Sequence, residues 1–401
     1  MILALLLLQT PNVVAVVIDD VGWIDVELVA TPSMDWLSSQ GTTYTRFYVS
    51  PVCTPSRTQF LYGLPSSVTG MGAPFQLSLA FEICADLVSL PRELRGIGYR
   101  TALFGKNHTI AVDPGRVLEE WDEAHAWTQE NIRTPKPRSY YLWDRLDGLS
   151  PSVESTYATT AVTDAALAWL SSPERMKGPW FACVSYHAIH APWQDAPGQV
   201  PGETHRERLE GMLAFLDIEI GRLLGAIDLE STLVYLFSDN GTPPEATPSP
   251  VPGKGKYTVR EPGIRVPLVI AGWNEPKGVS NDLVCITQLR GDILSRASGN
   301  GKRLGGSSCL VQYFRPNGLG PRSFDRRAAV LSSPWVKLTY ENGIEHLYVL
   351  PSDEEVPMKD YPDLVNRLRA ILEVGDVPML SPLQAQSQAY AREVPQPEDH
   401  R

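Results

Sequence analysis

The sequence predicts an α/β fold with a large, mostly parallel central sheet flanked by helices, followed by a small C-terminal antiparallel sheet plus a helix. Three observations support this fold class. Short apolar runs stop abruptly at polar or ionisable residues, helical stretches with one apolar face separate these runs, and the pattern changes after residue 310. Unbroken apolar runs are typical of parallel strands that helices cover on both faces.

Four apolar runs predict the parallel strands, at residues 12–18, 99–104, 180–186 and 232–237. Each run leads into polar or ionisable side chains: Asp19 and Asp20, Lys106 and His108, His187 and His190, and Asp239 and Asn240. Because the carboxyl ends of parallel strands meet at one edge of a sheet, where ligands bind in such folds, we expect these side chains to share one crevice. The alternative is that each cluster only marks the place where a strand leaves the core.

Helices are predicted between the strands. Residues 205–228 carry leucine and isoleucine at three- and four-residue spacing, which gives a long helix with one apolar stripe, and residues 157–170 are a weaker candidate. Farther along the chain, short strands are expected at 328–331, 336–340 and 347–350, with a closing helix at 363–372.

These patterns divide the chain into four parts. Residues 1–10 form a signal-like segment, 11–310 a catalytic α/β domain, 311–375 a small C-terminal subdomain, and 376–401 a Pro-, Gln- and Ser-rich tail that is expected to be disordered. The apolar run from Ile2 to Leu8 lacks a preceding Lys or Arg and a following Ala-x-Ala. An export signal and a plain N-terminal extension are both open, so a periplasmic or secreted location is expected and a cytoplasmic one is the alternative.

Composition limits the class of function. The 401 residues are 43% hydrophobic and 20% charged, as in ordinary globular proteins. The net charge of −11 argues against a nucleic-acid partner. No apolar run reaches the about 20 residues that a membrane span requires, so none is expected. The five cysteines are too few for a disulfide scaffold, and none forms the Cys-x-x-Cys pair typical of zinc sites.

An all-oxygen set of side chains follows two of the predicted strands: Asp19, Asp20, Asp239 and Asn240. Such a set suits a hard cation, Ca²⁺ or Mg²⁺, better than zinc or copper. Adjacent carboxylates at a strand end also repel each other unless a cation lies between them. The alternative is that these residues cap helices or form turns, since Asn-Gly is a common turn pair.

The sharpest motif runs from Cys53 to Arg57, with the sequence Cys-Thr-Pro-Ser-Arg. Pro55 fixes its own φ and biases the residue before it away from helix, so a helix is expected to begin just after Cys53. A cysteine near a helix N-terminus and beside an arginine is electrostatically activated. On these grounds alone, Cys53 is either a thiol nucleophile or a buried structural cysteine.

Together these residues resemble the type I sulfatases of the alkaline-phosphatase-like superfamily. Cys-x-Pro-Ser-Arg57 with the following Leu-x-Gly63 resembles the signature in which the cysteine is converted to Cα-formylglycine. Further segments resemble the family in the same order: Asp-Asp-x-Gly22, Gly-Lys-Asn-His108, His-Ala-Pro192, Ser-Asp-Asn-Gly241, Gly-Lys256 and Glu261 to Pro267. The resemblance extends over residues 11–375.

The resemblance implies hydrolysis of a sulfate monoester to an alcohol and inorganic sulfate. A formylglycine hydrate derived from Cys53 would attack sulfur. The second hydroxyl of the hydrate would then let the sulfated form expel sulfate and regenerate the aldehyde, which a serine ester cannot do. The implied metal is Ca²⁺, with Mg²⁺ as the alternative, held by position 53 and by Asp19, Asp20, Asp239 and Asn240. An enzyme that generates formylglycine is an implied partner.

The implied catalytic residues are Cys53, Arg57, Lys106, His108, His190 and Lys256. Arg57 and His108 would stabilise the hydrate. The two lysines and His190 would hold the sulfate, and one of these three would protonate the leaving oxygen. Lys254 is the alternative to Lys256, and His187 is expected to be a neighbour of the site.

Two other functions remain open. One is a formylglycine-dependent phosphonate or phosphodiester hydrolase, and the other is a non-catalytic anion-binding homologue with an unmodified Cys53. A two-zinc phosphatase is disfavoured because the chain has only seven histidines. The expected substrate is a sulfated small molecule or carbohydrate. Five tryptophans are candidates for stacking on a sugar or for filling the core: Trp23, Trp121, Trp127, Trp143 and Trp193.

Overall fold

The computed structural model describes residues 10–74, 87–109, 115–132, 139–172, 178–248, 254–299, 304–315, 317 and 323–373. Nearly all of the signal-like segment over 1–10, and the tail predicted to be disordered over 376–401, lie outside these residues. Within the described ranges, no helix is both long and apolar enough to cross a membrane. The expected domain boundary at residue 310 stays a prediction.

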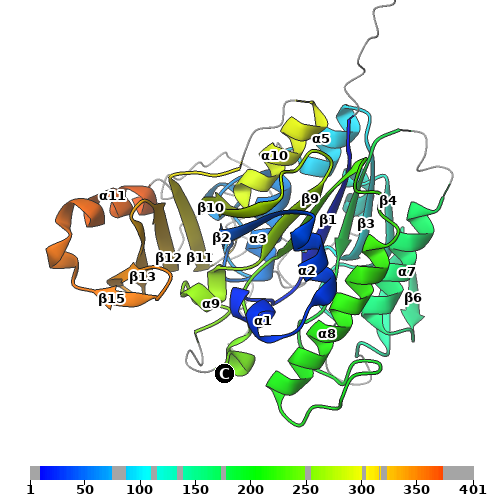
Figure 1. Cartoon of the computed structure of the whole chain (residues 1–401), viewed down its shortest axis with the longest axis horizontal. Helices are drawn as coiled ribbons and strands as arrows, with labels where there is room; N and C mark the ends of the chain where they lie inside the picture. Colours follow the sequence, from blue (N-terminus) through cyan, green and yellow to red (C-terminus); the bar gives the residue numbers. More distant parts are fainter. Residues whose placement is uncertain are drawn as a thin grey trace, which may run out of the picture.

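Ten of the described strands form the central sheet, in the order β10-β2-β9-β8-β1-β7-β3-β4-β5-β6 (Figure 1). Their bounds are β1 Asn12–Ile18, β2 Gly41–Tyr48, β3 Arg100–Lys106, β4 Glu123–Thr128, β5 Trp143–Asp147, β6 Ser150–Glu154, β7 Trp180–Ser185, β8 Thr232–Ser238, β9 Leu268–Gly272 and β10 Gly278–Cys285. The four strands at the centre, β8, β1, β7 and β3, pair in parallel and match the four predicted runs. The mostly parallel sheet is confirmed.

Helices cover both faces of this sheet. Their bounds are α1 Trp23–Leu28, α2 Pro32–Ser39, α3 Cys53–Tyr62, α4 Ser66–Thr69, α5 Leu90–Gly96, α6 Gly115–Glu120, α7 Ala158–Leu170, α8 His205–Leu224, α9 Glu261–Ile264, α10 Thr287–Ala297 and α11 Pro362–Glu373, with short 3₁₀ turns at Pro244–Ala246 and Met358–Asp360. Helices α2, α7 and α8 pack on one face, and α3, α5 and α10 pack on the other.

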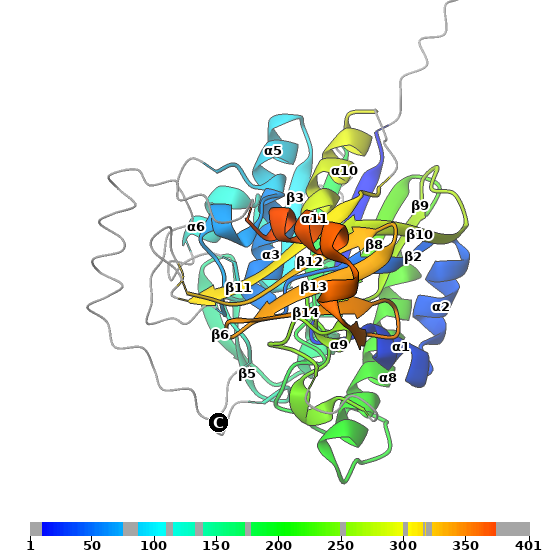
Figure 2. The same cartoon turned by 90° about the vertical axis from the view of Figure 1, so that its left-hand side faces the viewer.

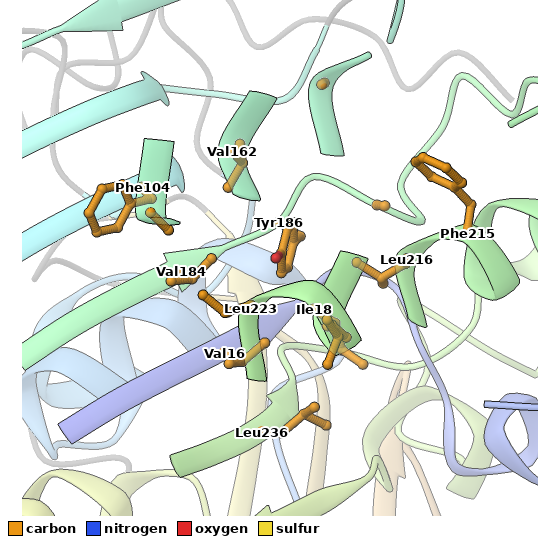
Figure 3. Close-up of a cluster of buried hydrophobic side chains, with 14 of the residues drawn as sticks. Val16, Ile18, Phe104, Val162, Val184, Tyr186, Phe215, Leu216, Leu223 and Leu236 are labelled. Carbon is orange, nitrogen blue, oxygen red and sulfur yellow. The ribbon is translucent and has the colours of Figure 1, made fainter. Parts of the chain in front are cut away.

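Strand β1 shows why the central runs are apolar without alternation. Its even-numbered residues, Val14 to Ile18, join the core beneath α7 and α8, and its odd-numbered residues, Val13 to Val17, join the core on the opposite face. None of them is more than 2% exposed. Figure 3 shows Val16 and Ile18 beside side chains from α8 and from neighbouring strands. A strand that is buried on both faces needs apolar residues at every position.

Helix α8 begins where the sequence predicts it. The Thr204 hydroxyl accepts a hydrogen bond from the Glu207 amide, and the Glu207 carboxylate accepts one in return from the Thr204 amide. This reciprocal cap satisfies amides that the first turn leaves without partners. The predicted end at residue 228 was wrong, because Gly225 caps the helix directly after Leu224.

A separate antiparallel sheet lies toward the C-terminal end of the described residues and is seen face-on in Figure 2. Its strands are β11 Ser308–Arg315, β12 Ser323–Ser332, β13 Trp335–Glu341, β14 Ile344–Val349 and β15 Glu354–Val356. Helix α11 covers one face of the sheet. Apolar side chains of its other face pack against residues of β2, β10 and α9. A disulfide between Cys285 and Cys309 joins the last residue of β10 to β11.

Candidate active site at the carboxyl edge of the central sheet

The carboxyl ends of three strands bring predicted site residues together. Asp19 and Asp20 follow β1, Asp239 and Asn240 follow β8, and Lys106 is the last residue of β3. The three aspartates, Asn240 and Lys106 are each at most 1% exposed. Distant segments thus deliver acidic, amide and cationic groups to one buried edge, as the strand pattern predicts.

Cys53 faces the acidic end of β1. It is the first residue of α3, as the turn at Pro55 predicts to within one residue. Its Sγ lies 3.5 Å from Asp19 Oδ1 and 3.3 Å from Lys256 Nζ. Burial, together with the negative charge of Asp19, raises the pKa of the thiol to about 12. An unmodified Cys53 therefore remains protonated near neutral pH and makes a poor thiolate nucleophile.

Each aspartate of the site is paired with a different cation. Arg57 Nε donates to Asp239 Oδ2 at 2.6 Å, Lys256 Nζ lies 2.5 Å from Asp20 Oδ1, and Lys106 Nζ contacts Asp19 Oδ2. Burial alone would raise the pKa of Asp19 and Asp20, but these cations outweigh it, and both pKa values are lowered. Asp19 and Asp20 are therefore available as anionic ligands.

The donor atoms suit a hard divalent cation. One ligand atom each from Asp19, Asp20, Cys53 and Asp239 lies within 4.8 Å of the other three. Asn240 Oδ1 is buried and has no hydrogen-bond partner among the described residues, although its Nδ2 donates to Asp20 Oδ1 at 2.7 Å. A buried acceptor without a partner is costly, and a cation among these oxygens would satisfy it.

Two histidines complete the group. His190 Nδ1 donates to the Ala191 carbonyl oxygen at 2.7 Å, which leaves Nε2 3.9 Å from Asp20 Oδ2. His108 is buried, with φ of 52°, and no residue in the described ranges forms a hydrogen bond with its Nδ1. Burial and nearby cations hold the pKa of His190 below its usual value and that of His108 well below it. Both rings are therefore neutral in the folded protein at neutral pH.

Two alternatives from the sequence can be compared in the structure. Lys254 is exposed, whereas Lys256 is 3% exposed and contacts both Asp20 and Cys53, so Lys256 is the lysine at the site. His187 lies 2.7 Å from Thr128 Oγ1 through its Nε2 and contacts none of the carboxylates by hydrogen bond or ion pair among the described residues. It is a neighbour of the site, as expected.

Two serines at the site were assigned no role from the sequence. Ser185 Oγ accepts a hydrogen bond from Arg57 Nη1 at 2.5 Å and donates one to the Lys106 carbonyl oxygen at 2.6 Å. Ser238 Oγ accepts from the Val21 amide at 3.0 Å and donates to the Asn240 carbonyl oxygen at 2.9 Å. Both are the last residues of their strands, β7 and β8, so the strand-end pattern that identified the aspartates could have identified them.

The tryptophans divide into two groups. Trp121, Trp127 and Trp143 are at most 1% exposed and fill the core. Trp193 is partly buried, and its Nε1 donates to the Ile189 carbonyl oxygen at 3.1 Å in the segment that carries His190. Trp23 packs against the Arg265 guanidinium, 4.6 Å from the ring centre. Trp193 thus contacts the segment that carries His190, and Trp23 contacts the segment from Glu261 to Pro267.

Comparison with known proteins identifies the family. The family model described as Sulfatase matches residues 11–290. Arylsulfatase J of Mus musculus is 29% identical over 323 residues, which cover 72% of this chain and 53% of that protein. N-acetylgalactosamine-6-sulfatase of Sus scrofa is 27% identical over 328 residues, which cover 72% and 62%. The matched region thus spans little more than half of the length of these relatives.

Solved structures show the same fold. Ps i-CgsB in complex with k-i-k-neocarrahexaose superimposes with a TM-score of 0.77 at 19% identity, over 96% of this chain and 98% of that one. The PsFucS1 sulfatase from Pseudoalteromonas sp. gives a TM-score of 0.64 at 18% identity, over 93% and 92%. With the family model matched over most of the chain and the predicted motifs gathered at one edge of this fold, the protein belongs to the sulfatase family.

Proposed function

We propose that this protein hydrolyses sulfate monoesters to an alcohol and inorganic sulfate, using a formylglycine formed from Cys53 and a bound divalent cation. One observation carries the proposal: position 53 lies within contact distance of Asp19 and Lys256, in the same buried cluster as Asp20 and Asp239. A nucleophile, an oxygen ligand set and cations for an anionic substrate therefore share one site.

The residues at the site have separate tasks. Asp19, Asp20, Asp239, Asn240 and the group at position 53 would hold the cation, which is Ca²⁺ or Mg²⁺ by its all-oxygen ligands. When bound, such a cation polarises a sulfate oxygen, and a formylglycine hydrate supplies the attacking hydroxyl. Lys256 would hold the group at position 53 and a sulfate oxygen, because its Nζ already lies 3.3 Å from Cys53 Sγ. Arg57 keeps Asp239 and Asp19 in place, through contacts of 2.6 and 3.5 Å.

His190 is the best-placed residue to protonate the leaving oxygen. Its side chain is 20% exposed, whereas those of Lys106 and Lys256 are 0% and 4% exposed, so His190 lies at the solvent side from which an alcohol would depart. The ring is neutral in the protein alone because burial and Lys256 lower its pKa. An anionic sulfate ester beside the ring would favour its protonated form, which is the form that a general acid needs.

The proposal includes the substrate class and the location. Sulfated carbohydrates are the first substrates to test, because several relatives at 25–27% identity are named N-acetylgalactosamine-6-sulfatase. A periplasmic or secreted location is supported by the Cys285–Cys309 disulfide, since disulfides persist in oxidising compartments. Maturation requires an enzyme that generates formylglycine.

The test combines mass spectrometry with turnover. The protein is produced with a formylglycine-generating enzyme. The mass of the peptide that spans Cys53 then shows whether the thiol has been converted to the aldehyde. Sulfate release is then measured on a panel of sulfated sugars and aryl sulfates, with phosphonate and phosphodiester substrates in parallel. Cys53→Ala, which cannot be converted, is the control and should release no sulfate.

The possible outcomes separate the alternative functions. Conversion together with sulfate release supports the proposal. Conversion with turnover only of phosphonates or phosphodiesters would reassign the site to that reaction. A thiol that stays intact beside an active maturation enzyme, with no turnover, would identify a non-catalytic anion-binding homologue.

A further inference from the structure

The segment that carries Lys256 is held from two sides. On the side of the active site, the Lys256 amide donates to the Thr242 carbonyl oxygen at 2.7 Å, and the Tyr257 amide donates to the Pro51 carbonyl oxygen at 2.9 Å. Its ammonium reaches Asp20 and Cys53, as described above. The position of this lysine therefore depends on the backbone of residues 256 and 257.

That backbone is in an unfavourable conformation. Tyr257 has a φ of 70°, in the left-handed region that residues other than glycine rarely adopt. Such a conformation persists only where surrounding contacts impose it. One of these contacts comes from outside the central sheet, because the Arg326 guanidinium of β12 donates to the Tyr257 carbonyl oxygen.

A second contact holds the segment four residues farther along. Lys337 of β13 is fully buried, and its Nζ lies 2.9 Å from Glu261 Oε1 and 2.9 Å from Asp353 Oδ1. The other oxygen of Glu261 accepts a hydrogen bond from the hydroxyl of Tyr48, the last residue of β2, at 3.0 Å. Burying a lysine costs folding free energy unless its charge is paired. Lys337 has no role in the proposed reaction. Glu261 is thereby fixed between the two sheets.

A third contact lies between these two. Arg260 Nε is 3.0 Å from Asp353 Oδ2, and its guanidinium lies 3.9 Å from the centre of the Tyr348 ring in β14. Residues 257 and 261 thus each meet a charged side chain of the C-terminal sheet, and residue 260 meets Asp353 in the turn between β14 and β15. The segment is a bridge from the active site to that sheet, although the matched family region ends at residue 290, before β11 begins.

We propose that the C-terminal sheet positions Lys256 against Cys53, with Arg326 and Lys337 as positioning residues that anchor the segment 254–264. The sheet is then part of the catalytic apparatus rather than an appendage. The kinetic consequences rest on the proposed sulfatase function, whereas the structural consequence, a segment ordered by the C-terminal sheet, does not.

The first test measures the segment directly. Arg326→Ala removes the bond to the Tyr257 carbonyl oxygen from a partly exposed site, so the full-length protein should still fold. Amide hydrogen exchange of peptides covering 254–264 should become about tenfold faster, as expected for loss of one net hydrogen bond. The matched control is Arg369→Ala, which breaks an exposed pair with Glu345 elsewhere on the same C-terminal unit and should leave this exchange unchanged. Unchanged exchange in Arg326→Ala would overturn the proposal.

The second test is a double-mutant cycle on the matured enzyme. Arg326→Ala should lower kcat/KM for sulfate esters by about tenfold, and it should have almost no further effect in a Lys256→Ala background, because coupled residues are not additive. Arg326→Lys should restore part of the activity. Equal losses in both backgrounds would show that Arg326 acts by another route. If the wild type releases no sulfate at all, the proposed function fails, and the exchange experiment still decides whether the C-terminal sheet orders the segment.

Lys337→Gln provides an independent check on the other anchor. It should speed exchange of 254–264 and lower kcat/KM in the same Lys256-dependent way. Circular dichroism establishes whether the variant folds; if it does not, Arg326→Ala alone decides the proposal. A folded Lys337→Gln with wild-type exchange in this segment would remove Lys337 from the anchor.

Discussion

At the scale of single residues, the site is balanced in charge before any cation binds. Asp19, Asp20 and Asp239 contribute three negative charges, and Lys106, Lys256 and Arg57 contribute three positive ones. A divalent cation would therefore leave the cluster with a net charge of about +2, which favours an anionic ester inside a protein whose net charge is −11.

The oxygen ligand set predicts that a bound cation stabilises the folded protein, an effect that is measurable without any substrate. Adding Ca²⁺ to protein treated with a chelator should raise the thermal unfolding midpoint, since a ligand that binds only the folded state stabilises it. A concentration of 100 times Kd corresponds to about 2.7 kcal/mol. Asp20→Asn should show a much smaller shift, because it removes one anionic ligand with little change in shape.

The same titration with Mg²⁺ identifies the preferred ion. The ion that gives the larger shift at equal concentration is the better fit to the oxygen cluster. A wild-type protein whose unfolding midpoint responds to neither ion would contradict the metal site.

A second residue-scale prediction concerns acid stability. Burial, followed by the charge of Lys106, lowers the pKa of His187 from its usual 6.5 to about 3. Below pH 6.5 this histidine therefore binds a proton in the unfolded chain but not in the folded protein. The free energy of unfolding falls as the pH drops from 6.5 toward 3. At pH 4.5 this histidine alone should cost about 2–3 kcal/mol, at 1.36 kcal/mol for each pH unit.

The measurement is denaturant unfolding of the wild type and of His187→Gln between pH 7 and 4.5. The variant loses the hydrogen-bonding ring at all pH values, but its stability should decline less steeply with acid. Parallel curves for the two proteins would mean that another group is responsible for the acid sensitivity.

The residues that sequence reasoning found and those it missed differ in a physical way. Asp19 and Asp239 follow long apolar strands, and the chain order alone places such residues at one edge of a parallel sheet. Tyr257 carries no comparable signal, because its role depends on a positive φ and on a contact with Arg326, 69 residues away. A pattern along the chain reports periodicity, whereas that contact depends on how two sheets are packed.

At the scale of elements, the loop after β8 and helix α9 pack without space for a side chain between them. A Cβ added at Gly241 would lie 1.8 Å from the Pro262 carbonyl oxygen. The Gly241 amide also donates to the Gly263 carbonyl oxygen at 3.0 Å. The proposed ligand Asn240 and the segment that bears Lys256 therefore approach each other through backbone alone.

Gly241→Ala should consequently disturb both segments at once. The clash is with backbone, so the chain must shift, at a cost of about 1–3 kcal/mol, and Asn240 and Lys256 should move apart. We expect a lower unfolding midpoint, a weaker response to Ca²⁺ and reduced kcat/KM. Denaturant unfolding and steady-state turnover measure these effects.

Gly225→Ala is the matched control for this substitution. Gly225 caps α8 with φ of −62°, and an added Cβ would meet nothing closer than 3.5 Å. Alanine fits that conformation and restricts the unfolded chain, so stability should stay the same or rise by about 0.4–1 kcal/mol. If both glycine variants behave alike, the close approach at Gly241 is not what holds the two segments.

The elements themselves were predictable to different degrees. Strand β1 was predicted to its exact ends. After its first residue, Asn12, every residue up to Ile18 faces one of the two cores and is apolar. Strand β9 was missed, as were five other strands of this sheet, β2, β4, β5, β6 and β10. Strand β9 runs antiparallel to both of its neighbours, β2 and β8, and β5 does the same with β4 and β6. An apolar run has no direction along the chain, so its sequence cannot show which way a strand enters the sheet.

At the scale of the whole molecule, two sheets meet along a boundary that is charged near the site and apolar elsewhere. The buried Lys337 and Glu261, together with the partly buried Asp353, form the charged part. The apolar part includes Ile264 and Val311, and it surrounds the Cys285–Cys309 disulfide. The scattered cysteines gave no sign of this link in the sequence, because their pairing depends on β10 and β11 lying side by side.

This disulfide should make a measurable contribution to the free energy of unfolding. It joins cysteines that are 24 residues apart with Cα atoms 5.6 Å from each other, and closing a loop of that size is worth about 3 kcal/mol. Cys309→Ser should lose most of this in denaturant unfolding, and a reducing agent should lower the wild-type midpoint but leave that of the variant unchanged. Cys183→Ala, which alters a buried cysteine that is free in the structure, is the control and should keep its response to the reductant. Peptide mapping without reduction shows the link directly, and finding Cys285 and Cys309 as free thiols in exported protein would refute both the pairing and the support it gives to an oxidising location.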